Sequence, residues 1–113
     1  MAEALTFGIT QGVTPKKFLE VISQCAGSSW MLENRAPHII DGDYTPHSAV
    51  NIWLKDLGIV LDIAASANFD APVTKAALQQ YVSANEQGHG LEDDAAVAKV
   101  YASQANVSLP GSK

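Results

Sequence analysis

The chain has 113 residues, of which 47% are hydrophobic, and its formal net charge is −5. This length and apolar content exclude a disordered chain and are enough for one domain with a core. The acidic balance argues against a nucleic-acid or anionic-membrane partner, and no apolar run is long enough to cross a bilayer. Cys25 is the single cysteine, so no internal disulfide can form and a cytoplasmic location is predicted.

The first predicted helix runs from the start of the chain to Gly12 and lacks a residue that could cap its amino end. This start suggests a piece cut from a longer protein. The second predicted helix spans residues 15–26, because Thr14 can cap it and Pro15 suits its first position. A short third helix around Trp30 is expected to stop before Pro37, since the residue before a proline is pushed out of the α region.

The longest predicted helix covers residues 48–68 and carries apolar residues on two opposed sides. The broader side holds Val50, Trp53, Leu54, Leu57, Val60, Leu61 and Ala64, and the other holds Ile52, Ile59 and Ile63. A helix that is apolar on opposite sides is typically enclosed by other helices. We therefore predict that this helix is buried at the centre of the domain.

A narrow polar strip with Ser48, Asn51, Lys55 and Asp62 lies between the two apolar sides of this helix, and Asp56 lies on a second strip. An ammonium group beside an aspartate in an enclosed helix needs a partner, because burial of a lone charge is costly. In one interpretation the strip faces a binding cleft. In the other, Lys55 extends to solvent and Asp56 meets an arginine or a helix end.

Two further helices complete the chain. One follows Pro72 and ends at the break of residues 88–90, and the run Glu92-Asp93-Asp94 begins the last helix, where acidic groups complement the free N–H groups. No segment shows the alternation of a strand. The predicted fold is all-α, with about six helices packed around the central buried helix. The helical domain is expected to span residues 1–107, and residues 108–113 are expected to form a flexible tail.

The chain contains no complete catalytic apparatus of its own. Cys25 falls at the carboxyl end of a helix, where a thiolate is disfavoured, so it is expected to pack in the core. His38, His47 and His89 lack the spacing of zinc ligands, so no metal site is predicted. The Asp41-Gly42-Asp43 turn lacks the closing glutamate of a calcium-binding EF-hand loop.

Three segments taken together resemble one family. They are residues 2–5 with Gly12, the run from Trp53 to Leu61, and the stretch from Pro72 through Gly88-His89-Gly90-Leu91-Glu92-Asp93. Their order and spacing resemble the carboxyl-terminal helical domain of the β-hydroxyacid dehydrogenases, the 3-hydroxyisobutyrate dehydrogenase-like enzymes. The amino-acid sequence around Lys55 is most similar to the threonate dehydrogenase branch. The resemblance implies a unit like the carboxyl-terminal domain of 6-phosphogluconate dehydrogenase.

The resemblance also implies how the full enzyme would work. An amino-terminal Rossmann domain, missing here, would bind NAD or NADP, and a small hydroxy acid would be oxidised by hydride transfer in the cleft between the domains. The family's catalytic lysine would lie upstream of Met1, so no catalytic residue is assigned in this chain. Lys55 would contact the cofactor, and Ser48, Asn51 and Asp56 would lie on the substrate side.

On this resemblance the chain is a substrate and oligomerisation domain that is inactive alone and holds no cofactor by itself. Its expected partners are the missing Rossmann domain, the hydroxy acid and a second copy in a dimer, with no nucleic acid and no membrane. The residues leave an alternative open, in which the chain is a stand-alone helical module that binds a protein or a small ligand through the Lys55 strip.

Overall fold

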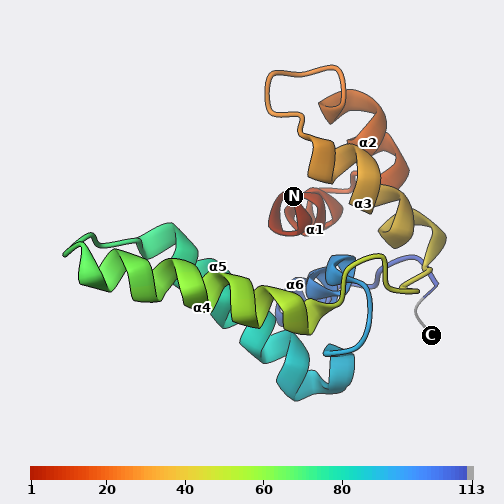
Figure 1. Cartoon of the computed structure of the whole chain (residues 1–113). Helices are drawn as coiled ribbons and strands as arrows, with labels where there is room; N and C mark the ends of the chain where they lie inside the picture. The colour runs from red at the N-terminus through yellow and green to blue at the C-terminus, as the bar shows by residue number, and fades with distance from the viewer. Residues whose placement is uncertain (112–113) are drawn as a thin grey trace.

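The computed structural model describes residues 1–111, which form helices and contain no β-strand. The elements are α1 (Ala2–Thr10), α2 (Pro15–Ile22), α3 (Trp30–Asp41), α4 (Val50–Ser66), α5 (Pro72–Ala84), the π-turn η1 (Asn85–His89), the 3-10 turn η2 (Asp94–Val97) and α6 (Ala98–Ala105). In Figure 1, α4 and α5 lie side by side and extend away from the remaining helices as a long arm. None of the helices in residues 1–111 combines the length and the hydropathy that a membrane span requires.

Local sequence signals fix the amino ends of two helices. The Thr14 hydroxyl accepts a hydrogen bond from the Lys17 N–H at 3.2 Å, and Pro15 occupies the first position of α2. The Ser29 hydroxyl likewise accepts from the Leu32 N–H at 3.0 Å and caps α3. These caps satisfy N–H groups that the helices themselves leave free.

The prediction that Pro37 stops the third helix is wrong. Helix α3 continues through Pro37 to Asp41 and ends at Gly42, whose positive φ of 65° gives a left-handed cap. The proline removes one intrahelical hydrogen bond. Burial of Leu32 and Ile39 from the same helix compensates for that loss.

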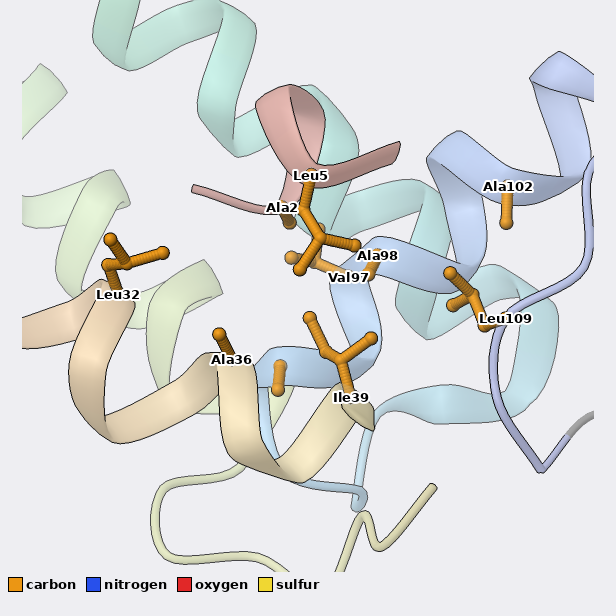
Figure 2. Packing of buried hydrophobic residues seen from close by; sticks show 10 residues of the cluster. Ala2, Leu5, Leu32, Ala36, Ile39, Val97, Ala98, Ala102 and Leu109 are labelled. Carbon is orange, nitrogen blue, oxygen red and sulfur yellow. The ribbon is translucent and has the colours of Figure 1, made fainter. Parts of the chain in front are cut away.

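The hydrophobic core lies between α1, α3 and the η2–α6 segment (Figure 2). Leu5 from α1 and Ile39 from α3 are fully buried and point toward Val97 and Ala98. Leu109, which falls in the predicted flexible tail, is also buried in this cluster. The end of that predicted tail, residues 112 and 113, lies outside the described residues.

Helix α4 is not the buried centre of the domain, so that part of the predicted fold is wrong. Val50 is its one buried residue, whereas Ile52, Ile59 and Ile63 are 42%, 50% and 65% exposed. The helix packs along α5 on one side and leaves the isoleucine side open. The two apolar sides reflect one packed face and one uncovered face, and uncovered apolar faces mark interaction surfaces.

Candidate functional site

Two neighbouring carboxylates are buried where η2 begins. The side chain of Asp94 is 2% exposed and accepts hydrogen bonds from Arg35 Nε at 2.7 Å and from Trp53 Nε1 at 2.8 Å. Arg35 belongs to α3 and Trp53 to α4, so one carboxylate joins both helices to η2. A buried charge requires this kind of pairing.

Asp93 joins a second set of groups. Its carboxylate accepts from His38 Nδ1 at 2.8 Å, from the His47 N–H at 2.9 Å and from the Ala95 N–H at 3.1 Å. Burial of the carboxylate would raise its pKa, but the hydrogen bonds from His38 and the two backbone N–H groups outweigh burial, and the pKa of Asp93 is lowered. The carboxylate therefore stays ionised at neutral pH.

Backbone contacts place the two aspartates against the loop before α4. The Asp93 N–H donates to the Tyr44 carbonyl at 2.9 Å, and the Asp94 N–H donates to the Ser48 carbonyl at 2.6 Å. Asp93 also caps η2 through its bond to the Ala95 N–H. The loop, α3, α4 and η2 thus meet at one point.

A cavity of about 230 Å³ opens beside Asp94, between α1, α3, α4, α5 and η2. Arg35 and Asp94 supply its charged groups, and the rings of Trp53 and Tyr81 stack in its wall with centroids 5.8 Å apart. Met1, Ala2, Met31, Ala95 and Val97 complete the lining. Burial first, and Asp94 second, raise the pKa of the Tyr81 phenol, so this ring remains neutral.

The predicted cofactor contact, Lys55, lies on the open side of α4. Its side chain is 71% exposed, and Nζ is 3.7 Å from Asp56 Oδ1. Lys55 does not line the cavity, because Trp53, two positions earlier, projects to the opposite side of the helix. A role for Lys55 or Asp56 in binding stays a prediction.

The other two predicted residues lie at the start of α4. Ser48 presents its carbonyl to Asp94, and the Asn51 N–H donates to the Gly90 carbonyl at 3.0 Å. The Asn51 side chain lies so close to Gly90 that a Cβ there would be 2.7 Å from Asn51 Nδ2. Asn51 Oδ1 is buried and has no hydrogen-bond partner among the described residues. Their predicted substrate-side role remains untested.

Sequence reasoning missed Arg35, Asp93 and Asp94 as the charged centre of the fold. The acidic run by itself predicts a helix start, whereas the Ala95-Ala96-Val97-Ala98 sequence that directly follows it is buried. Cys25 was expected in the core but is exposed. Among residues 1–111, no group of three histidine, cysteine or acidic side chains is placed to hold a metal ion.

Acid should destabilise the fold through protonation of the buried Asp93 carboxylate. Because the folded pKa of Asp93 lies below its ordinary value, the carboxylate stabilises the fold above the unfolded pKa, and this stability is lost as the pH falls below about 4. Chemical denaturation between pH 7 and pH 3 should show the loss. The loss should be smaller in Asp93→Asn, and an equal pH dependence in both proteins would contradict the role given to Asp93.

Comparison with known proteins points to one group of enzymes. A family model described as NAD-binding of NADP-dependent 3-hydroxyisobutyrate dehydrogenase matches residues 1–101. The L-threonate dehydrogenase of Cupriavidus necator is 50% identical over 110 residues, which are 97% of this chain and 36% of that protein. The L-threonate dehydrogenase of Escherichia coli K12 is 45% identical over 112 residues, which are 99% of this chain and 36% of that protein.

A solved structure agrees with these matches. The crystal structure of a 3-hydroxyisobutyrate dehydrogenase from Salmonella typhimurium superposes with a TM-score of 0.86 at 45% identity, and the match covers 88% of this chain and 35% of that one. The chain thus spans about a third of the length of these relatives.

The family match also corrects the predicted type of domain. The matching model is described as the NAD-binding part of the enzyme, and it covers residues 1–101 of this chain. The prediction of a carboxyl-terminal domain like that of 6-phosphogluconate dehydrogenase, separate from the NAD-binding part, is therefore wrong.

Proposed function

This chain belongs to the NAD-binding 3-hydroxyisobutyrate dehydrogenase-like family, and on that premise we propose that its full-length enzyme oxidises a small hydroxy acid with NAD or NADP. The main support is identity of 45–50% with two L-threonate dehydrogenases across almost the whole chain. In this reaction the carbon that bears the hydroxyl gives a hydride to the nicotinamide, and the hydroxyl gives its proton to a base. An aldonic acid such as threonate is the proposed substrate class.

Lys55 is the residue of this chain that we assign to the cofactor side. Its ammonium is exposed on the side of α4 that no described residue covers, so the rest of the enzyme can reach it. An ammonium group there would form charge-assisted hydrogen bonds with a cofactor phosphate or a substrate carboxylate. Asp56 lies 3.7 Å from the ammonium, and this loose, exposed pair leaves Lys55 able to turn toward an anion.

The same side of α4 offers a docking surface. Ile52, Ile59 and Ile63 follow one another at helical spacing beside Lys55, and all three are exposed. An apolar stripe of this kind is stabilised when a partner covers it. In the full-length enzyme we assign this role to the remaining domain, and in the isolated chain to a second copy.

Ile59→Glu should therefore prevent self-association of the isolated chain, because it places a charge in the middle of the stripe. Sedimentation velocity should show a dimer for the unmodified chain and a monomer for the variant. Val21→Glu on α2, also at an exposed apolar position, should leave the dimer intact. A monomeric unmodified chain, or equal effects of both substitutions, would contradict the assignment.

A spectrophotometric assay of the full-length enzyme tests the proposed function. With L-threonate or 3-hydroxyisobutyrate and either NAD or NADP, we expect reduced nicotinamide to accumulate for at least one pair. The 113-residue chain alone is expected to give none, because the family resemblance places the catalytic lysine outside it. The proposal fails if the full-length enzyme reduces neither cofactor with any small hydroxy acid.

A further inference from the structure

The guanidinium of Arg35 retains unused hydrogen-bond donors. The residue is only 9% exposed, and its hydrogen bond runs from Nε to Asp94 Oδ1. Neither Nη group has a hydrogen-bond partner among residues 1–111, although a guanidinium carries five N–H donors. The Nη atoms are not among the fully buried atoms that lack a partner, so a ligand can reach them. An anion bound there would accept charge-assisted hydrogen bonds from them in place of water.

The geometry of Arg35 suits a carboxylate. Its Nε edge is held by Asp94, which Trp53 Nε1 fixes from the other side at 2.8 Å. The two Nη groups remain, and their planar fork matches the two oxygens of a carboxylate. Both oxygens of Asp94 already accept hydrogen bonds, one from Arg35 and one from Trp53, so this carboxylate does not compete for the Nη groups.

The cavity beside Arg35 suits an apolar, planar body. The stacked rings of Trp53 and Tyr81 lie in its wall, and Met31, Ala95 and Val97 add apolar surface. Its volume of about 230 Å³ admits only a small molecule. A few polar groups in an otherwise apolar concavity are typical of small-molecule sites.

We propose that this cavity binds a small organic carboxylate, with the carboxylate on the Nη groups of Arg35 and a planar apolar body against Trp53 and Tyr81. The site is separate from Lys55. Trp53 lines the cavity, and Lys55, two positions later on the same helix, points about 200° away from it. A bound carboxylate would contact α3, α4 and η2 together. The proposal does not depend on the proposed dehydrogenase activity.

Nuclear magnetic resonance of the complete 113-residue chain tests the site, with the Trp53 indole N–H as the reporter. Titration with benzoate should shift this signal to saturation. Benzamide has the same shape but no charge, and it should bind at least about tenfold more weakly, because only the anion accepts charge-assisted bonds from Arg35. Equal affinity for benzoate and benzamide, or no saturable shift with benzoate, would overturn the proposal.

Two variants locate the binding. Arg35→Lys keeps the charge that Asp94 needs but removes the planar fork, so benzoate affinity should fall at least about tenfold. Met31→Trp narrows the cavity without touching the ion pair and should also abolish the shift of the Trp53 signal, which tests the site even if Arg35→Lys fails to fold.

Lys75→Gln is the matched control, because Lys75 is an exposed cation outside the cavity. It should bind benzoate within about twofold of the unmodified chain. Unchanged binding in both Arg35→Lys and Met31→Trp, or a comparable loss in Lys75→Gln, would place benzoate elsewhere and refute the site.

Discussion

Asp94→Ala should destabilise the chain by about 3–5 kcal/mol, the largest loss expected from a single side chain. The substitution leaves the guanidinium of Arg35 buried without its counter-ion, and it also leaves the Trp53 indole N–H without its acceptor. Both partners lie on helices that Asp94 joins to η2, so packing of α3 and of α4 against η2 should loosen as well. Denaturant unfolding followed by circular dichroism would measure the loss.

Asp70→Ala is a matched control for this experiment. Asp70 pairs with Lys75 at 2.7 Å, the same distance as the Arg35–Asp94 pair, but its side chain is 73% exposed. Exposed pairs contribute little, so this variant should unfold like the unmodified chain. The double variant Arg35→Met/Asp94→Leu should recover part of the loss, because it leaves no unpaired charge. If Asp70→Ala and Asp94→Ala were equally destabilising, the central role of the buried pair would be refuted.

Lys55→Ala in the full-length enzyme should lower kcat/KM by about 10- to 100-fold, because a hydrogen bond to a charged group is worth about 1.5–3 kcal/mol. Steady-state kinetics with the best hydroxy acid and varied cofactor would measure the change. Since Lys55 is mostly exposed and pairs only loosely with Asp56, the melting temperature should not change.

Lys75→Ala provides the comparison for Lys55. Lys75 is a similarly exposed lysine on α5, the neighbouring helix of the arm. The Lys75→Ala enzyme should keep the kcat/KM of the unmodified enzyme. Normal kinetics in Lys55→Ala would show that the lysine of the Lys-Asp-Leu sequence has no part in the reaction. A loss of melting temperature together with activity would indicate a structural role instead.

Helix positions could be predicted from the sequence because caps act locally. Thr14 and Pro15 begin α2 as expected, since the hydroxyl and the ring act on N–H groups within three residues. Pro37 failed as a stop signal because its local cost is offset by core packing of α3, which involves residues distant in sequence.

The place of α4 in the fold could not be predicted from its periodicity. Apolar residues on two sides show that both sides favour burial, but they do not say whether the same chain supplies both covers. In the described structure α5 covers one side, and Ile52, Ile59 and Ile63 stay open on the other. The predicted burial of α4 is wrong because helices of the described chain cover only one of its two apolar sides.

The buried charge centre was hidden by the distance between its members along the chain. Arg35 and Asp94 are 59 positions apart, and His38 and Asp93 are 55 positions apart. No spacing rule connects such residues. Only the apolar run after Asp94 indicated that the acidic residues enter the interior.

Local unfolding should begin at the free end of the arm that α4 and α5 form. Core residues in these helices are Val50 and Ala84, which both lie at the end of the arm that meets α6 and η2. Toward Ser66 and the turn that leads into α5, fewer side chains are shielded, and less apolar contact opposes local unwinding. Amide protons should accordingly exchange with solvent progressively faster from the root of the arm to its tip, until a partner closes over it.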